Sequence, residues 1–308
     1  EIFFKTLPFF LLIVLGYTSG KKNFFSHGAT VYLAKFVFYF ALSAMLFKFA
    51  AFVNLAEFLK WEIVFSYFLA TGLIYFLGLM LSLYLSKSLS EAAVEAQCCA
   101  IGNVGFLGIP MLSLLMGPNA VSYVVLVLAV DLLVFGTLII ILIICAQEGI
   151  LKLEISRTVT IGLIKNPMII SLTLGFLWSA MGIPIPQAMN EFLSLLGGAA
   201  TPCALFAIGA SLAHRKTENF SSIVWVSAFK LVFHPFAVAL SAIYIFGLDP
   251  FACAVMVMAS ALPVAGNIYI IAQNYRVTPE RVSASIFVST AFSIVTVTIT
   301  LKLIETIF

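Results

Sequence analysis

The sequence predicts an all-α membrane protein, with ten transmembrane helices arranged as two inverted five-helix repeats. Three observations lead to this fold class: the composition, the distribution of basic residues and an internal repeat. The chain of 308 residues is 63% hydrophobic and 9% charged, whereas a soluble domain carries roughly a quarter charged residues. Apolar runs of about 18 residues or more, the length of a spanning helix, recur along the whole chain.

The apolar segments are separated by short polar loops. The longest polar interruption, "QEGILKLEISRTVTIGLIK", covers residues 147–165 and leaves five segments on each side. We therefore predict a first five-helix repeat at 1–146, a cytoplasmic linker at 147–165 and a second repeat at 166–308. The predicted helices cover residues 4–20, 27–52, 61–85, 91–116, 119–146, 166–182, 187–212, 220–247, 250–273 and 279–307.

Basic residues are concentrated in alternate loops. Loops that follow odd-numbered helices carry ten of the sixteen Lys and Arg residues, and the loops and termini on the other side carry three. Because Lys and Arg accumulate in cytoplasmic loops, we expect both termini to face outward and the linker to face the cytoplasm. The formal charge of +3 is small and gives no reason to expect a nucleic-acid partner.

The two halves resemble each other at a nearly constant offset. Gly16 in "LPFFLLIVLGY" matches Gly175 in "NPMIISLTLGF", 159 residues further on. Other matches at offsets of 159 to 161 are Pro8 with Pro167, Leu46-Phe47 with Leu205-Phe206, Ile63-Val64 with Ile223-Val224 and Pro118 with Pro279. Because five is odd, two copies in one chain must insert in opposite directions, which is the inverted-repeat plan of secondary transporters.

Helix-breaking residues occur at corresponding places in the fourth and ninth helices. "CCAIGNVGFLGIP" (98–110) contains Gly102, and "SALPVAGN" (260–267) contains Pro263. Non-helical backbone is tolerated within a bilayer only where protein covers it or where it lines a cavity. We therefore predict two unwound stretches that cross near mid-membrane and direct free N–H groups of the second half-helices at a ligand. The predicted substrate-binding residues are Gly102, Asn103, Val104, Gly105, Pro263, Val264, Gly266 and Asn267. A simple kink in each helix is the alternative.

Ionisable residues within the predicted helices are the second candidate feature. Asp131 lies in the apolar stretch "VVLVLAVDLLVFGTLIIILI", where a charge is costly and usually functional. Asp131 either carries a proton or helps to bind a metal ion, or it forms a static pair with Lys35 or Lys230. Lys230 shares a helical face with His234 and either neutralises Asp131 or attracts an anionic substrate. We mark Asp131 and Lys230 as coupling residues.

We predict a structural role for two further pairs of residues. "FALSAMLF" (40–47) matches "AATPCALF" (199–206), which places Ser43 opposite Pro202 and predicts a bend in the second and seventh helices. Packing explains such a bend, and a role in lining the site is the alternative. Glu91 and Glu95, one turn apart at the start of the fourth helix, are assigned to a wet surface face.

The order and spacing of five motifs resemble the auxin efflux carrier family, which includes the plant PIN-FORMED auxin exporters and bacterial relatives described as malonate or malate permeases. The motifs are "LPFFLLIVLGY" (7–17), "GNVGFLGIPML" (102–112), "KNPMIIS" (165–171), "KLVFHP" (230–235) and "ALPVAGNIYIIAQNY" (261–275). The resemblance implies a fold similar to bacterial sodium/proton antiporters, in which helices four and nine cross as unwound segments.

Carried over to this sequence, the family's crossover residues are Asn103 and Pro263. The chain departs from the plant members at Gly102, where they have proline, and at Asp131, where they have an uncharged polar residue. The second departure favours a proton-linked mechanism. By the same analogy, helices one, two, six and seven form a scaffold side that forms a homodimer, and the other helices form the transport side.

The leading hypothesis is a secondary transporter in the bacterial cytoplasmic membrane that moves a small organic anion by alternating access. The anion is a carboxylate, either auxin-like or a dicarboxylate, and H⁺ or Na⁺ is the coupling ion, with no cofactor. The alternative is a Na⁺/H⁺-type cation antiporter that uses Asp131. The sequence contains neither HExxH nor GxSxG, so an enzyme is not expected. The expected partners are the substrate, the lipid bilayer and a second copy of the chain.

Overall fold

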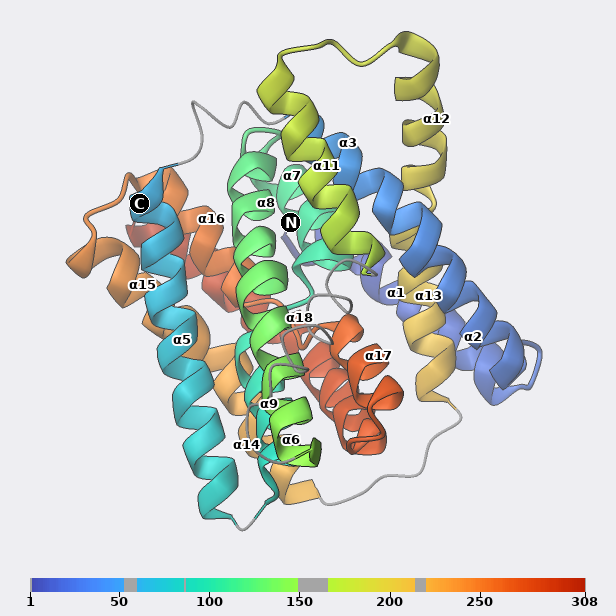
Figure 1. Ribbon diagram of the computed structural model, residues 1–308, viewed down its shortest axis with the longest axis vertical. Coiled ribbons are helices and arrows are strands. Elements are labelled where there is room, and N and C mark those ends of the chain that lie inside the picture. Colours follow the sequence, from blue (N-terminus) through green and yellow to red (C-terminus); the bar gives the residue numbers. More distant parts are fainter. Residues whose placement is uncertain (1, 53–59, 86, 149–165, 214–219, 308) are drawn as a thin grey trace. The chain divides into compact units, whose positions relative to one another are not determined.

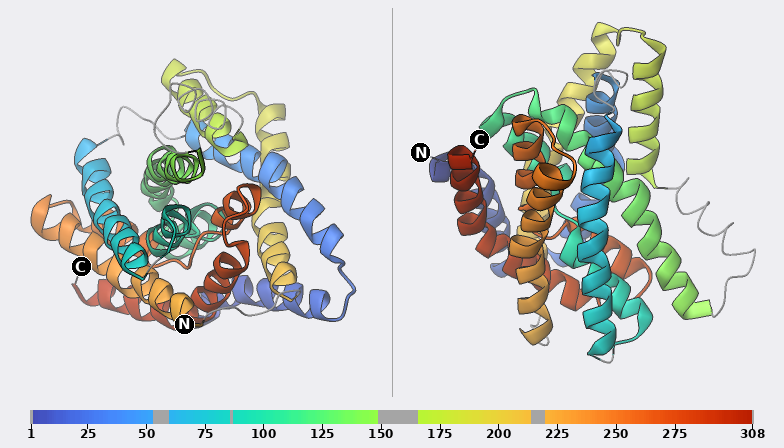
Figure 2. Two further views of the ribbon diagram at one scale, coloured as in Figure 1. Left: turned by 60° about the horizontal axis from the view of Figure 1, so that its bottom comes forward. Right: turned by 90° about the vertical axis from the view of Figure 1, so that its left-hand side faces the viewer.

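The computed structural model describes residues 2–52, 60–85, 87–148, 166–213 and 220–307. Within these residues the regular structure is helical (Figure 1 and Figure 2), apart from one isolated antiparallel bridge between Gly102 and Val264. Helices occupy each of the ten ranges predicted from the sequence. Of the predicted linker, residues 149–165 lie outside the described part, and the two residues before them end a helix.

Contacts divide the chain into two units. The first unit takes its described residues from Glu1–Lys60, Gly105–Leu126 and Ile164–Arg215, and the second from Trp61–Val104, Val127–Leu163 and Lys216–Phe308. The predicted helices one, two, six and seven all fall within the first unit. The second half of helix four and the start of helix five join them there, which the sequence-based division did not anticipate.

The first unit is built by close helix packing. Its elements are α1 (Ile2–Lys21), α2 (His27–Phe36), the π-helical turn η1 (Val37–Ala41), α3 (Leu42–Phe52), α7 (Ile109–Met116), α11 (Pro167–Met181), α12 (Gln187–Gly198) and α13 (Ala200–Leu212). Helix α1 packs along α13, and α3 packs along α11 and α12. Glycines let these backbones touch, because a Cβ at Gly16 would collide with the carbonyl of Phe206.

The second unit contains the interrupted helices. Its elements are α5 (Trp61–Tyr84), α6 (Leu89–Ala100), η3 (Asp131–Phe135), α9 (Gly136–Glu148), α14 (Phe220–Ala228), η4 (Phe229–Phe233), α15 (His234–Leu240), η5 (Ser241–Ile245), α16 (Pro250–Ser260), α17 (Gly266–Asn274) and α18 (Pro279–Ile307). Two further elements, η2 (Val104–Gly108) and α8 (Ala120–Val130), begin in one unit and end in the other. Helix α5 packs along α6, and α14 and α17 pack against α18.

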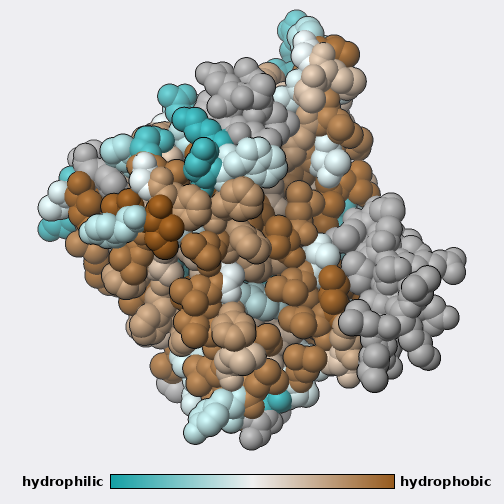
Figure 3. All heavy atoms as spheres, turned by 60° about the vertical axis from the view of Figure 1, so that its left-hand side comes forward, coloured by the Kyte–Doolittle hydropathy of each residue, from teal (hydrophilic) through white to brown (hydrophobic). Residues whose placement is uncertain are grey.

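Long apolar helices and an apolar surface identify this as an integral membrane protein. Among the described residues, six helices are long and apolar enough to span a bilayer, and shorter apolar helices cover Val104–Met116, Pro167–Met181 and Pro250–Ser260. Along α5, Phe65, Leu69, Leu73 and Phe76 lie on one face and are each about half exposed. Hydrophobic residues also predominate on the face drawn in Figure 3, as expected where lipid replaces water.

Local sequence explains where the half-helices begin. The Ser88 side chain accepts a hydrogen bond from the Glu91 N–H and caps α6. The Asp249 carboxylate accepts from the N–H groups of Phe251 and Ala252 and caps α16, whose first residue is a proline. Both follow the usual preferences at helix N-termini.

The residues of the predicted bends lie next to irregular backbone. Ser43 follows the π-helical turn η1, and its hydroxyl donates to the Phe38 carbonyl five residues earlier at 3.3 Å. Pro202 lies in the first turn of α13, just after Ala199 separates α12 from α13. A π-helical turn and a break are recognised causes of helix bending. A role for either residue in lining a site stays a prediction.

Candidate functional site

Two interrupted helices of the second unit are joined at their breaks. Helix α6 ends at Ala100 and is followed by extended backbone at Ile101. Helix α16 ends at Ser260, and five residues separate it from α17, which begins at Gly266. The Asn103 N–H donates to the Pro263 carbonyl at 2.8 Å, and the Ala265 N–H donates to the Ile101 carbonyl at 3.2 Å. We call residues 101–104 with 261–265 the crossing. Each of its two segments thus satisfies one N–H group and one carbonyl group of the other.

The crossing is enclosed by protein. Val104, Leu262 and Val264 are fully buried, and Asn103 is 5% exposed. The Val264 N–H donates to the Ser289 hydroxyl of α18 at 3.1 Å. This enclosure meets the condition under which non-helical backbone is tolerated within a bilayer.

The structure brings together most of the predicted substrate-binding residues. Gly102, Asn103 and Val104 lie on one strand of the crossing, opposite Pro263 and Val264 on the other. Gly266 and Asn267 open α17, where the first N–H groups have no partner within the helix. The Asn267 Oδ1 is buried, and among the described residues it has no hydrogen-bond partner. Gly105 falls in the first unit.

Lys230 lies against the end of the interrupted helix α16. It is fully buried within η4, and its Nζ donates to the Ser260 carbonyl at 2.6 Å and contacts His234 Nδ1 at 2.7 Å. When Lys230 is charged its ammonium group can only donate, so Nδ1 accepts this bond and the imidazole proton is on Nε2. That Nε2 then donates to the Thr71 hydroxyl, 3.0 Å away.

Gly102 makes room for the Lys230 side chain. A Cβ at Gly102 would lie 3.2 Å from both Cε and Nζ of Lys230 and 3.3 Å from the Ala259 carbonyl oxygen. The departure from proline at this position therefore has a physical reason, because a side chain here would press on the lysine.

Asp131 is buried and partly unpaired. Its side chain is 1% exposed, Oδ1 accepts a hydrogen bond from the Tyr67 hydroxyl at 2.9 Å, and Oδ2 has no partner among the described residues. The predicted static pair with Lys230 is not a direct ion pair, since none within 4.0 Å joins the two in the described residues. They still interact electrostatically, and the Tyr67 ring lies 5.9 Å from the His234 ring. The other predicted partner, Lys35, lies over the Tyr32 ring, 5.7 Å from its centroid.

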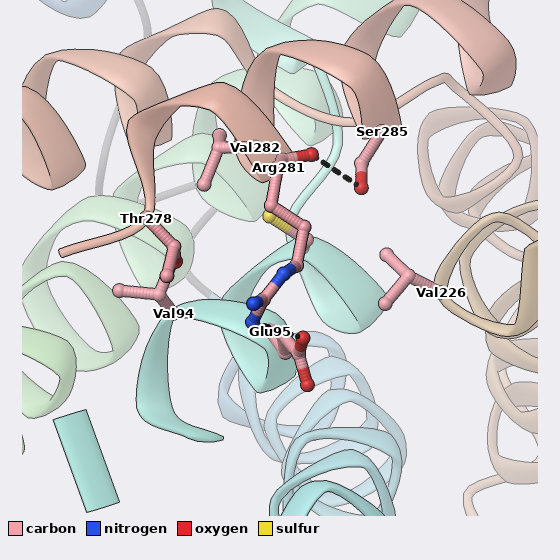
Figure 4. Close-up of a pocket in the computed structure, with 8 residues that line it drawn as sticks. Val94, Glu95, Val226, Thr278, Arg281, Val282 and Ser285 are labelled. Carbon is pink, nitrogen blue, oxygen red and sulfur yellow. Dashed lines mark hydrogen bonds and ion pairs between the residues drawn. The ribbon is translucent and has the colours of Figure 1, made fainter. Parts of the chain in front are cut away.

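The assignment of Glu95 to a wet surface is wrong. Glu95 is 3% exposed, and its Oε1 accepts a hydrogen bond from Arg281 Nη1 at 2.9 Å, while Ser82 donates to the other oxygen. Arg281 comes from the first turn of α18 and supplies the opposite charge that makes burial of a carboxylate tolerable. Figure 4 shows its guanidinium directed at Glu95 in a small pocket. Glu91, 3.6 Å from Arg281, retains 31% side-chain exposure.

Sequence reasoning missed the residues that partner the buried charges. Tyr67 and Thr71 of α5 contact Asp131 and His234 respectively, and Ser260 contributes only its main-chain carbonyl. Polar residues four apart in the apolar stretch "SYFLATG" (66–72) were the available signal. A main-chain acceptor leaves no such signal in the sequence.

Comparison with known proteins places the chain among transporters. A protein-family model described as "Membrane transport protein" matches residues 1–301. The chain is 29% identical over 312 aligned positions to a Rhizobium meliloti (strain 1021) protein named "Putative malonate transporter", covering 99% of this chain and 96% of that one. It is 28% identical over 301 positions to Escherichia coli (strain K12) and Shigella flexneri proteins named "Uncharacterized transporter YfdV". Each alignment covers 94% of this chain and 93% of the relative.

Proposed function

Because the chain belongs to the auxin efflux carrier family of membrane transport proteins, we propose that it moves a small organic anion across the cytoplasmic membrane by alternating access. The family makes it a membrane transporter and not an enzyme. The proposed substrate class, a carboxylate, rests on the crossing and on the charges near it.

The crossing is the observation that carries the proposal. Secondary transporters bind their substrates near mid-membrane between discontinuous helices, whose N-terminal ends face anionic groups. Here the first turn of α17 offers the N–H groups of Gly266 and Asn267 together with the partnerless Asn267 Oδ1. The N–H groups suit the oxygen atoms of a carboxylate, and the Oδ1 would accept a hydrogen bond from a donor on the ligand.

Paired contacts in the first unit support the proposed inverted repeat. A Cβ at Gly16 would meet the Phe206 carbonyl, and a Cβ at Gly175 would meet the Phe47 carbonyl at 2.7 Å. Moving each residue of the first pair by 159 positions, forward for Gly16 and backward for Phe206, yields the second pair. Such an exchange is expected when two copies face each other across a pseudo-twofold axis.

The crossing has the same exchange relation. Moving Asn103 forward and Pro263 backward by 162 positions converts one hydrogen bond, Asn103 N–H to Pro263 O, into the other, Ala265 N–H to Ile101 O. We therefore retain repeats at 1–146 and 166–308 and ten spanning helices, with both termini outside. An axis through the crossing would place the substrate between the repeats.

The charge near the crossing favours an anion. Lys230 is fully buried at the end of α16, and the first turn of α17 adds the positive end of a helix dipole. Among the relatives, the R. meliloti protein is named for malonate. Small dicarboxylates are therefore the first substrates to test, followed by monocarboxylates. The second unit is proposed to move and the first to act as a scaffold that forms a homodimer.

Counterflow in proteoliposomes tests this function. Vesicles loaded with unlabelled malonate should accumulate labelled malonate, because an alternating-access carrier exchanges substrate across the membrane. Asn267→Ala should reduce this exchange. Asn190→Ala on α12, the same change in the first unit, should not. If the wild type and Asn190→Ala are both folded but exchange no small carboxylate, the proposal is contradicted.

A second candidate is a Na⁺/H⁺-type cation antiporter, which the partnerless Oδ2 of Asp131 favours. Such a carrier would acidify or alkalise vesicles when a Na⁺ gradient is imposed, whether or not carboxylates are present. An internal pH dye measures this directly. The anion carrier predicts no response to Na⁺ alone.

A further inference from the structure

The second unit carries a buried lysine, Lys230, at the C-terminal end of the interrupted helix α16. Helix α16 ends at Ser260 in the interior. The N–H groups of Ala261 and Leu262 bond the Val257 and Ala259 carbonyls, whereas among the described residues no main-chain N–H outside the helices bonds the Ser260 carbonyl. The C-terminal end of a helix is also its negative end. In a bilayer no water is available to satisfy such groups, so a donor or a bound cation must do so.

The Lys230 Nζ fills this role. It lies 2.6 Å from the Ser260 carbonyl oxygen and contacts no solvent, since the residue is fully buried. In secondary transporters, unwound carbonyls and the C-terminal ends of half-helices commonly coordinate Na⁺. The ammonium group therefore lies at the kind of site where other carriers place a coupling ion.

A buried carboxylate gives an independent reason for a cation here. Asp131 is 1% exposed and its Oδ2 has no partner among the described residues. The carboxylate interacts electrostatically with Lys230. Without the ammonium group, this charge and the Ser260 carbonyl would have no positive charge to offset them, and a carboxylate left so in a low-dielectric interior is strongly disfavoured.

The fit around Lys230 indicates that the site is built for the side chain. Gly102 leaves space for Cε and Nζ, either of which a Cβ there would approach to 3.2 Å. His234 Nδ1 accepts the second hydrogen bond at 2.7 Å, and His234 is itself held by Thr71. Three separate elements, the crossing, α15 and α5, thus position one ammonium group.

We propose that Lys230 is a covalently tethered substitute for a coupling metal cation, so that transport requires no Na⁺ and loss of the ammonium group creates a site for Na⁺ or a small alkylammonium ion. The proposal deepens the proposed function, on which it rests, by assigning the site's ion requirement. It also gives the two proposed coupling residues separate roles: Lys230 supplies the positive charge, and Asp131 is left as the group that exchanges a proton.

Thermal unfolding of the purified protein in detergent tests the proposal. Lys230→Ala should unfold at a lower temperature than the wild type. NaCl or ethylammonium chloride should then raise its Tm by about 3 °C once the ion is in roughly tenfold excess over its Kd. Choline chloride should not, because choline is bulky and has no N–H donor. The wild type and Lys48→Ala, an exposed lysine of α3, should respond equally weakly to all three salts.

Two variants keep the test decisive. Lys230→Met fills the same volume without charge, so it should show no response to Na⁺ or ethylammonium. If Lys230→Ala alone does not fold, Lys230→Ala with Asp131→Asn removes both charges, and this protein should fold and ignore all three cations. An unchanged Tm of Lys230→Ala in every salt, or an equal Na⁺ shift in the wild type, would overturn the proposal.

This readout needs no substrate. Absence of cation rescue with intact malonate exchange would reject the tethered cation and keep the anion carrier. Cation rescue without exchange of any carboxylate would support the tethered cation and reject the anion carrier.

Discussion

Of the buried polar and charged side chains in the described residues, all but Thr30 lie in the second unit. The buried ionisable residues among them are Glu95, Asp131, Lys230, His234 and Arg281. The first unit instead brings backbones together through glycines, on α1 against α13 and on α11 against α3. Both units contain long apolar helices, so hydrophobicity alone does not distinguish them.

The difference between the two units, buried polar groups in one and glycine-mediated packing in the other, corresponds to two different tasks. Small residues that let helices approach closely give association in a membrane without polar groups, which suits a unit that holds its shape. Buried ionisable residues are costly in a membrane and are usually retained for function. The contrast therefore supports the proposal that the second unit carries the chemistry of transport and the first gives mechanical support.

Breaking the buried ion pair should have the largest effect. Arg281→Ala leaves Glu95 buried without its partner, which should cost about 3–5 kcal/mol of unfolding free energy. Denaturant unfolding in detergent measures the loss. Glu91→Ala, which removes the longer and more exposed contact, serves as the control and should cost less than about 1 kcal/mol. Equal effects of the two changes would show that the Glu95 pair does not stabilise the second unit.

Adding a methyl group between the packed helices of the first unit should come next. Gly16→Ala and Gly175→Ala each place a Cβ against a main-chain carbonyl of the partner helix. Overpacking of this kind costs roughly 1–3 kcal/mol. The two changes should cost similar amounts if the repeat relation holds. Gly198→Ala, where a Cβ meets nothing within 4 Å, should leave the Tm unchanged or raise it slightly. A difference between Gly16→Ala and Gly175→Ala as large as either effect would count against the repeat.

Neutralising Asp131 should change coupling more than folding. Asp131→Asn keeps an acceptor for the Tyr67 hydroxyl, so unlabelled-for-labelled exchange should stay within about threefold of the wild type, less than 1 kcal/mol. Accumulation driven by a pH gradient should be lost, because the group that exchanges a proton is gone. Complete loss of exchange in a folded variant would favour the cation antiporter.

The smallest effect is expected at the exposed lysine of the first unit. The Lys48 Nζ donates to the Ser194 hydroxyl at 2.7 Å in an exposed position. Exposed polar contacts contribute little, so Lys48→Met should change the unfolding free energy by less than about 0.5 kcal/mol. Thermal unfolding checks this. A loss as large as that of Lys230→Met would remove the contrast between the units.

The helices and the two breaks could be predicted from the sequence because their causes are local. Apolar runs set the helix ranges, and Gly102 and Pro263 weaken the helix at the positions where α6 and α16 end. The π-helical turns at Asp131 and at Lys230 were not predicted, because no single residue type produces one. They place both proposed coupling residues where the helix ladder is locally irregular, a common feature of functional sites.

The partners of the buried charges could not be predicted because they come from distant parts of the chain. Arg281 lies 186 residues from Glu95, and Tyr67 lies 64 residues from Asp131. Glu95 in isolation has the spacing of a surface residue, one turn after Glu91. Its burial follows only from the approach of α18 to α6, which is a property of the tertiary structure.

The two reciprocal hydrogen bonds of the crossing use only peptide groups. Any residue other than proline can supply the N–H at 103 or 265, and any residue can supply the carbonyl at 101 or 263. The two bonds themselves therefore do not depend on which side chains residues 101, 103, 263 and 265 carry. A library that varies Val104, Val264 and Asn267 together would be a practical starting point for testing whether the proposed anion carrier can be redirected to acids of other sizes.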